Sequence, residues 1–199
     1  MIQSLNSFTV HPHYGRSSTT FDICLDRGRA PVVRAHKDGA YDGVRQYEVH
    51  AGPELDQLIG YVASFDAWSV GRSQLGEVRH RFRILHHTQW IFAQKGLGEL
   101  VGEPVGVSSR LRRGSSLSTI LDNPATDVVF SSRFHFRSPE SAGFELTRLR
   151  GLRARYAVKV CDDRVDRLLV LACVVHFARF STEDVRQAIV DLASNPFRE

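Results

Sequence analysis

The sequence predicts a mainly β protein with α structure: an antiparallel β-barrel of about 10–12 strands that encloses a hydrophobic helix at residues 165–180, plus an amphipathic helix at 182–194. Two observations lead to this fold class. Many short segments of alternating polarity are separated by turn signals, and one long apolar stretch follows them. The chain of 199 residues is 42% hydrophobic, which suits one core, so we expect residues 1–199 to form a single domain.

The apolar stretch is VDRLLVLACVVHFARF at 165–180, in which His176 alone interrupts the apolar run from Leu168 to Ala178. A helix of about 15 residues is roughly 22 Å long, whereas a bilayer core needs about 20 apolar residues, so we expect no transmembrane segment. Apolar residues would cover every face of this helix, and such a helix must be enclosed by protein. We expect His176 to be a hydrogen-bonded core histidine whose burial penalises the protonated form.

Strands are expected where apolar and polar residues alternate between glycine, proline and aspartate turn signals. The expected strands are 7–10, 21–25, 30–35, 47–50, 57–63, 79–85, 90–93, 127–130, 133–136, 144–149 and 155–160, with two shorter apolar pieces at 100–101 and 105–107. Residues 65–76 are not assigned, and regularly spaced glycines from Gly96 to Gly106 predict tight turns. Closing these strands into a barrel would remove the exposed sheet edges.

The order of strand, acidic turn and apolar helix in RYAVKVCDDRVDRLLVLACVVHFARF at 155–180 resembles the tubby C-terminal-like superfamily, which includes tubby domains, phospholipid scramblases and LURP-one-related proteins. FDICLDRGRAPVV at 21–33 and LIGYVA at 58–63 are similar to LURP-one strands with a D-x-G turn. The resemblance covers 7–180 as a tubby-like barrel with a central helix and leaves 181–199 as a C-terminal helical appendage. It implies a roughly twelve-stranded barrel closed around a hydrophobic helix, and an association with phospholipid or membranes.

The chain also departs from these relatives. It shows no proline-rich arm or cysteine-rich lipidation segment of the scramblase kind, so lipid transport is not implied. No position matches a tubby phosphoinositide-binding motif, and no residue of that site is transferred. Residues 1–15 lack a basic region followed by a long apolar region, so we expect a cytoplasmic location, with peripheral attachment to a membrane left open.

Arginine dominates the positive charge. The chain has 26 Lys+Arg against 22 Asp+Glu, a net charge of +4, and lysine occurs only at 37, 95 and 159. A rigid guanidinium fork suits phosphate and carboxylate, and each basic residue near an anionic membrane contributes about 1 kcal/mol. The predicted anion- or lipid-binding residues lie in one loop and one hairpin: Arg110, Arg112, Arg113, Arg148, Arg150, Arg153 and Arg155. The alternative is a solvated face with local acidic partners.

Catalytic and metal motifs are weak. The histidines lack the short spacings of zinc sites, and Pro12 between His11 and His13 predicts a loop there. Asp162, Asp163 and Asp166 could suggest a cation site, but capping of the apolar helix, for which Asp162 or Asp163 is placed, explains these carboxylates without a cation. The G-x-S-x-G and G-x-G-x-x-G patterns are incomplete. We therefore predict no catalytic residue, no metal ligand and no cofactor, and a binding protein in preference to an enzyme.

Three functions are compatible with these features. The first is a non-enzymatic tubby-like barrel that binds anionic phospholipid headgroups or a protein partner through its arginine-rich surface. The alternative is a nucleic-acid-binding barrel in which aromatic residues among the basic ones stack on bases: Phe82, Trp90, Phe134, Phe136 and Tyr156. A hydrolase or transferase with an unrecognised histidine and aspartate pair is the third.

Overall fold

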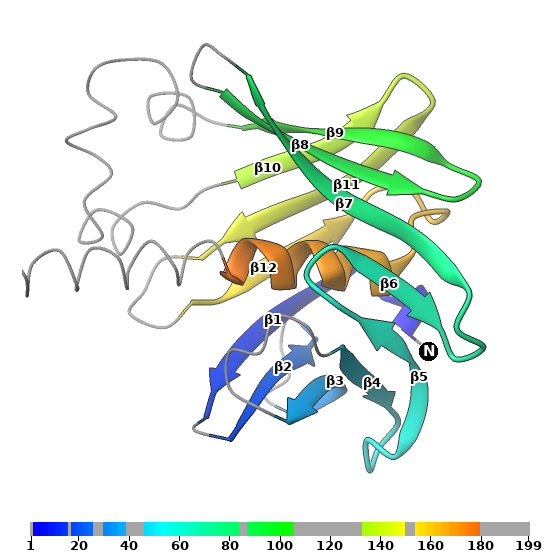
Figure 1. Cartoon of the computed structure of the whole chain (residues 1–199), viewed down its shortest axis with the longest axis vertical. Helices are drawn as coiled ribbons and strands as arrows, with labels where there is room; N and C mark the ends of the chain where they lie inside the picture. Colours follow the sequence, from blue (N-terminus) through cyan, green and yellow to red (C-terminus); the bar gives the residue numbers. More distant parts are fainter. Residues whose placement is uncertain are drawn as a thin grey trace, which may run out of the picture.

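The computed structural model describes residues 2–15, 17–25, 30–38, 46–83, 87–105, 133–149 and 154–179. A 3-10 turn, η1 (Ile2–Ser4), precedes twelve strands that form a closed antiparallel barrel (Figure 1). The strands are β1 (Ser7–Tyr14), β2 (Ser18–Cys24), β3 (Pro31–Asp38), β4 (Tyr47–Ala51), β5 (Gln57–Val62), β6 (Asp66–Ser69), β7 (Gln74–Arg83), β8 (His87–Gln94), β9 (Gly98–Pro104), β10 (Arg133–Ser138), β11 (Ser141–Arg148) and β12 (Tyr156–Val160). Residues 167–179 are helical.

The barrel closes where the last strand pairs with the first. Phe8 of β1 stands opposite Val158 of β12, and every other strand pairs with its neighbours in the sequence. The mainly β class and the closed antiparallel barrel are therefore confirmed. The expected strand 127–130 and the helix 182–194 lie outside the described residues.

Two segments differ from the expectation. Residues 65–76, which were not assigned, contain β6. β9 runs through Gly102, where a turn was expected after the apolar piece 100–101; most of the second expected piece, 105–107, lies outside the described residues. Gly102 lies inside β9, where a Cβ atom would stand only 2.8 Å from the Phe136 ring. This glycine makes room for a neighbouring aromatic side chain, so its position in the sequence does not mark a turn.

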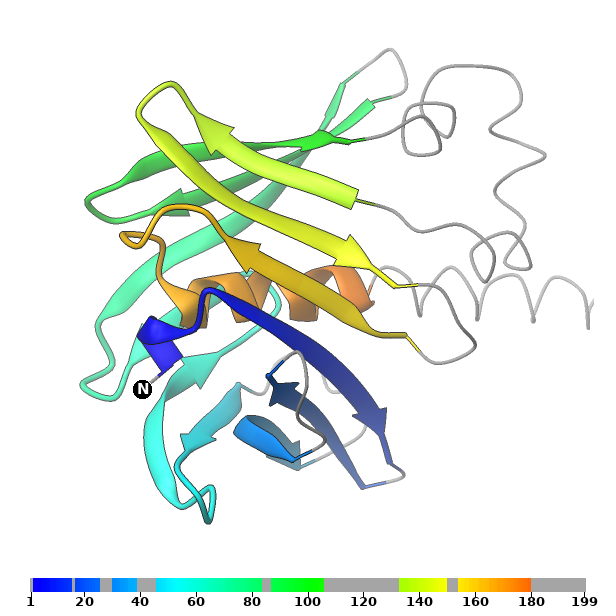
Figure 2. The same cartoon turned by 180° about the vertical axis from the view of Figure 1, so that it is seen from behind.

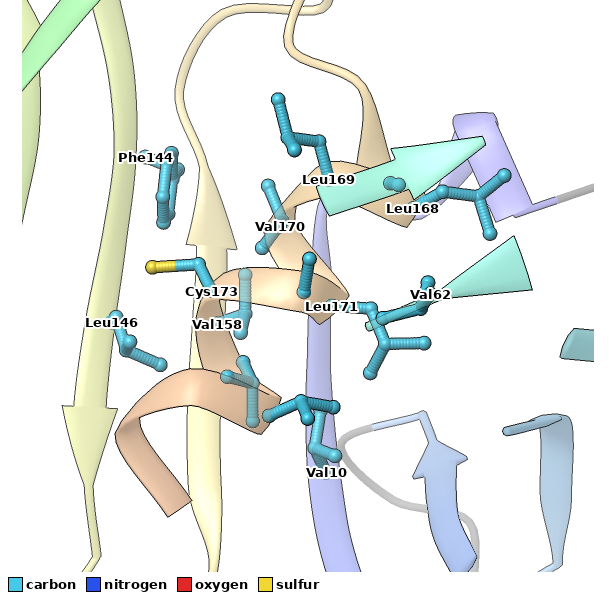
Figure 3. Packing of buried hydrophobic residues seen from close by; sticks show 14 of the residues in the cluster. Val10, Val62, Phe144, Leu146, Val158, Leu168, Leu169, Val170, Leu171 and Cys173 are labelled. Atoms are coloured by element: carbon cyan, nitrogen blue, oxygen red, sulfur yellow. The ribbon is translucent and has the colours of Figure 1, made fainter. Parts of the chain in front are cut away.

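Most residues of the described helical segment are buried in the core. From Leu168 to His176 each residue is no more than 3% exposed. Figure 3 shows Leu168, Leu169, Val170, Leu171 and Cys173 among buried residues of β1, β5, β11 and β12. On another side of the helix, Phe177 stacks on Trp90 of β8 with ring centroids 4.1 Å apart. Full burial of one such aliphatic side chain contributes about 1.5–3 kcal/mol.

Close approach between the helix and a strand depends on a small residue. A Cβ atom at Gly76 of β7 would stand 2.6 Å from Leu169 Cδ2, which is closer than carbon atoms pack. Glycine at this position therefore lets the helix lie against the backbone of β7. In the part of the chain that the structure describes, no helix is both long and apolar enough to cross a bilayer.

The helix is capped by Asp166, whose Oδ1 accepts hydrogen bonds from the backbone N–H groups of Leu168 at 2.8 Å and Leu169 at 3.4 Å. Capping by Asp162 or Asp163 was therefore wrong, because the helix begins at residue 167 and those aspartates lie in the turn before it. Asp162 instead accepts hydrogen bonds from the Ser141 hydroxyl and from Arg164.

Arg167, which is 1% exposed, ties the start of the helix to the N-terminal segment. Its guanidinium donates to the carbonyl oxygens of Leu5 at 3.1 Å and Val165 at 2.6 Å, and to Asn6 Oδ1 at 2.8 Å. The ion is buried because these oxygens replace the water it would otherwise bind.

Candidate functional site

The helix ends on the same side of the barrel as β1, β3 and β11, and β12 begins there (Figures 1 and 2). We call this end of the barrel the mouth. Of the predicted anion-binding residues, Arg148 and Arg155 are described and both lie at the mouth, where β11 ends and β12 begins. The others, Arg110, Arg112, Arg113, Arg150 and Arg153, lie outside the described residues.

Arg148 and Arg155 face opposite sides of the sheet. Arg148 pairs in register with Tyr156, which is 1% exposed and belongs to the core, so Arg148 lies on the inner face. Arg155 precedes Tyr156 and therefore lies on the outer face, where it is exposed. The two arginines mark the same end of the barrel without forming one continuous patch.

Arg155 is close to His11 of β1. Partial burial lowers the pKa of His11, and the positive charges of Arg155 and His13 lower it further. The loop expected at Pro12 was wrong, because Pro12 lies within β1 opposite Phe21. Pairing of β1 with β12 stops at Val10, so Pro12 does not interrupt that ladder.

Arginines farther along the outer face are paired with carboxylates on the adjacent strand or, for Arg79 on β7 and Glu99 on β9, on the next strand but one. Their nitrogen to oxygen distances run from 2.5 to 2.8 Å in the pairs Arg34–Asp22, Arg79–Glu99, Arg133–Glu145 and Arg137–Glu103. None of these four arginines belongs to the predicted anion-binding set, for which a solvated face with local acidic partners was the alternative. Exposed ion pairs of this kind typically contribute about 1 kcal/mol or less to the free energy of unfolding.

A different set of polar side chains lies on the inner face at the mouth. Tyr14 pairs in register with Thr19, and Thr19 with Lys37, across β1, β2 and β3. Lys37 follows the inward-facing Val33 and Ala35 in the alternation of β3 and is only 7% exposed. Its Nζ lies 4.9 Å from the centroid of the Tyr47 ring on β4, a cation–π contact.

Tyr47 connects this row to the end of the helix. Burial raises the pKa of its phenol and nearby Tyr14 adds to the shift, against the opposing effects of the Arg179 charge and a hydrogen bond with Thr19. The phenol therefore stays protonated at neutral pH. Arg179, the last described residue of the helix, is exposed. We call Tyr14, Thr19, Lys37, Tyr47 and Arg179 the mouth cluster.

Beside the mouth cluster, the buried His176 lies against the half-buried His80. His176 is 0% exposed, and its Nε2 is 3.4 Å from Nδ1 of His80 on β7. The ring centroid of Phe65 lies 4.5 Å from that of His176, and the centroid of Trp90 lies 5.0 Å from it. Burial, together with the charges of His80 and Arg179, lowers the pKa of His176 to about 4. The expected burial of His176 and its cost for the protonated form are confirmed.

Within the described ranges, no group of three or more histidine, cysteine, aspartate or glutamate side chains is arranged to hold a metal ion. The cysteines Cys24, Cys161 and Cys173 are thiols. Burial raises the pKa of Cys173, which keeps this thiol protonated and unreactive. The mouth cluster, by contrast, consists of cations and hydroxyl groups, which suit an anion.

Comparison with known proteins finds no matching protein-family model, no matching curated protein and no matching solved structure. The class that the fold itself defines is a closed twelve-stranded antiparallel barrel with a basic, hydroxyl-lined mouth. The resemblance to the tubby C-terminal-like superfamily stays a prediction from the sequence.

The sequence interpretation missed Lys37, Tyr47 and Arg179. A signal for Lys37 was present: extending the expected strand 30–35 by two residues continues the inward series of Val33 and Ala35 to position 37. Arg179 directly follows the apolar run of the helix. The proximity of Tyr47 to both cations depends on strand register, which the sequence pattern does not fix.

Proposed function

We propose that this chain is a non-enzymatic, tubby-like and LURP-one-like barrel that binds anionic phospholipid headgroups with its mouth. The observation that carries the proposal is the gathering of arginines from three elements at that end: Arg148 from β11, Arg155 beside β12 and Arg179 from the helix. At about 1 kcal/mol for each cation near an anionic surface, three give weak, reversible attachment. The predicted residues Arg110, Arg112, Arg113, Arg150 and Arg153 would add to it.

Exposed aromatic side chains support this orientation. Tyr14 is 39% exposed and Phe65 is 43% exposed, and both lie at the mouth, Phe65 beside His176. Leu25 and Val70, which are also exposed, lie toward the other end of the barrel. Aromatic rings are the side chains that favour the headgroup level of a bilayer, so the mouth combines both elements of a peripheral membrane site.

The proposal extends to the C-terminal part of the chain. We propose that the hydrophobic helix at 165–180 is enclosed by the barrel, as in tubby-like folds, and that an amphipathic helix at 182–194 follows it. Burial on all sides of residues 168–176 and contacts with β7 and β8 support the enclosure. The location that fits this function is the cytoplasmic surface of a membrane, with a protein partner as the alternative occupant of the mouth.

Burial argues against the nucleic-acid alternative. Trp90 is 6% exposed, Phe136 is 0% exposed and Tyr156 is 1% exposed, so none of these rings offers a face to a base. Phe134 packs against the core. Proteins that bind single strands stack bases on exposed aromatic rings. Binding to anionic lipid needs only cations and a few exposed aromatic residues at one end of the barrel.

Vesicle co-sedimentation tests the proposal. The full chain should bind phosphatidylcholine vesicles that contain a quarter phosphatidylserine, and should bind them less at high salt. The variant Arg148→Gln/Arg155→Gln/Arg179→Gln should lose roughly 100-fold in affinity at 1 kcal/mol per cation. The charge-matched control is Lys95→Gln/Arg137→Gln/Lys159→Gln, whose side chains are exposed away from the mouth. Equal binding of both variants, or equal binding to neutral vesicles, would contradict the proposal.

A further inference from the structure

We propose that His11 and His13 bind a divalent transition metal ion on the outer face of β1. The inference goes beyond the proposed function and does not depend on it. In the sequence, Pro12 between the two histidines predicted a loop, in which their side chains would have no fixed relation. In the structure Pro12 lies within β1, opposite Phe21, so the two histidines belong to one strand.

Both imidazole rings lie on one face of this strand. Side chains of a strand alternate between its faces, so residues 11 and 13 point the same way, with Cα atoms about 6.8 Å apart. Phe8 and Val10 are buried in the core in this alternation, so the histidines lie on the outer face. His11 is half-buried, and the side chain of His13 is 57% exposed. An ion can therefore reach them from solvent.

Thr9 sets the tautomer of His11. Oγ1 of Thr9 lies 3.2 Å from Nε2 of His11, and the same hydroxyl donates to the carbonyl oxygen of Cys24 at 3.5 Å. Because the hydroxyl proton is used in that bond, the hydroxyl oxygen accepts a hydrogen bond from the Nε2–H group of the ring. A neutral imidazole carries one such proton, so Nδ1 of His11 keeps the lone pair that a metal ion needs.

Asp22 does the same for His13. Its Oδ2 lies 3.5 Å from Nε2 of His13, and a carboxylate beside a ring nitrogen favours the proton there, which leaves Nδ1 unprotonated. Two hydrogen bonds from Arg34, at 2.6 and 3.1 Å, hold this carboxylate in place. Asp22 stands opposite His11 in the strand register, so the His13 ring leans toward His11. Histidine ligands of metal sites are oriented in this way by the partner of their other nitrogen.

Two imidazole nitrogens select the kind of ion. Imidazole suits Cu²⁺, Ni²⁺ and Zn²⁺, whereas Mg²⁺ and Ca²⁺ prefer oxygen. At a bond length of about 2.0–2.1 Å, a tetrahedral ion needs its ligand nitrogens roughly 3.3 Å apart, and the broad χ2 distribution of histidine lets the rings rotate to that separation. In the part of the chain that the structure describes, no three histidine, cysteine or acidic side chains are arranged around an ion. Water therefore completes the coordination, and the ion is exchangeable.

Arg155 limits the affinity of this site. Partial burial lowers the pKa of His11, and the charges of Arg155 and His13 lower it further, so both groups lie close to its ring. A guanidinium beside the site repels an incoming cation. The charge of Asp22 does not compensate, because Arg34 already neutralises it. Replacing Arg155 should therefore strengthen metal binding, which is the opposite of its expected effect on binding to anionic vesicles.

Titration calorimetry of the full chain without an affinity tag tests the site, with Cu²⁺ and Zn²⁺ as ligands and Mg²⁺ as the negative control. All proteins carry Cys161→Ser, because this exposed thiol can bind the same ions. We expect Cu²⁺ to bind more tightly than Zn²⁺, and Mg²⁺ to give no heat of binding. His11→Gln and His13→Gln should each lower the Cu²⁺ affinity at least tenfold, because each removes one of two ligands.

Two further measurements separate coordination of the ion from a structural role of the histidines. The electron paramagnetic resonance spectrum of bound Cu²⁺ should show two imidazole nitrogens in the parent chain and one in either single variant. Asp22→Asn should lower the Cu²⁺ affinity about tenfold or more, the usual effect of removing the partner that orients a ligand. Arg155→Gln should raise the affinity, since it removes a nearby positive charge.

The matched control is His50→Gln/His135→Gln, which removes two histidines from separate strands, β4 and β10, and should leave the Cu²⁺ affinity unchanged. If His11→Gln lowers the melting temperature of the metal-free protein, His13→Gln, at the more exposed position, still decides the test. Unchanged Cu²⁺ affinity in His11→Gln/His13→Gln, an equal loss in the control, or Mg²⁺ binding as tight as Cu²⁺ binding would overturn the proposal.

Discussion

Nε2 of His176 on the helix lies 3.4 Å from Nδ1 of His80 on β7, and 96 residues separate the two in the sequence. The rings are stacked with centroids 5.5 Å apart, next to Trp90 and Phe65. A distance of this kind requires one nitrogen to carry a proton and the other to accept it. Because its pKa is lowered to about 4, His176 is neutral at neutral pH, and its contact with His80 links the helix to the barrel wall beside the mouth.

Acidification should destabilise the protein through His176. Its pKa falls from 6.5 to about 4 on folding, so between these values the unfolded chain binds more protons and stability rises with pH. The contribution is complete above pH 6.5 and is lost as pH falls toward 4. We expect urea unfolding to show about 2 kcal/mol less stability at pH 5 than at pH 7.5, and a much smaller difference in His176→Phe.

This pH window separates His176 from Asp162. Hydrogen bonds from Arg164 and Ser141 hold the pKa of the Asp162 carboxyl below its ordinary value of 3.8, so its contribution is present above that value and is lost only in stronger acid. An unchanged pH dependence in His176→Phe would show that other groups cause the loss between pH 7.5 and 5.

Replacing Arg167 should destabilise the fold strongly. Arg167→Met leaves the carbonyl oxygens of Leu5 and Val165 without the guanidinium that now binds them. Leaving a buried acceptor without its donor typically costs about 1–3 kcal/mol, and several acceptors lose theirs here. Chemical denaturation measures the effect. The control Arg164→Met removes an exposed guanidinium from a neighbouring turn and should destabilise the fold much less. Similar losses in both variants would contradict the structural role of Arg167.

Alanine substitutions on opposite faces of the helix test its enclosure. Leu169 and Leu171 are both 0% exposed and stand about 200° apart around a helix of 3.6 residues per turn. Each leucine to alanine change should cost about 2–5 kcal/mol because it removes buried surface and leaves a cavity. Val70→Ala, at a position 52% exposed, should be nearly neutral. A silent substitution at either leucine would mean that one side of the helix faces water.

The ion pairs on the outer face should contribute little to the stability of the fold. Arg34 donates two hydrogen bonds to Asp22, at 2.6 and 3.1 Å, and their geometry is good, yet the arginine is largely solvated. We expect Arg34→Met to cost about 1 kcal/mol or less, and less still in high salt because ions screen exposed charges. A loss well above that, unchanged by salt, would show that the pair is more strongly coupled than its exposure indicates.

The strand pattern and the apolar run were sufficient to predict a closed antiparallel barrel and a buried helix segment, because alternation and continuous hydrophobicity are local signals. Gly102 misled the prediction since a glycine at a turn and a glycine under a neighbouring ring look the same in a sequence. The helix start was misplaced for a related reason: Asp162, Asp163 and Asp166 all precede the apolar run closely, and only the backbone shows which one caps it.

The candidate site was less predictable. The clustering of arginines in the sequence predicted a site that includes Arg148 and Arg155. The pairing of Arg148 with Tyr156 shows that these two side chains lie on opposite faces of the sheet. The mouth cluster takes single residues from several strands and from the helix, and no short motif contains them. Strand register and the position of the helix end bring Lys37, Tyr47 and Arg179 together, and these are properties of the assembled barrel.

The seam between β1 and β12 has a consequence for how the polypeptide folds. Val10 of β1 pairs with Tyr156 of β12, and nearly the whole barrel lies between them in the sequence. The ribosome must therefore synthesise almost all of the barrel before β1 can pair with β12. Long-range strand pairing of this kind is slow and leaves edges open to other chains meanwhile. Nascent chains that stop short of β12 are thus the species most dependent on chaperones.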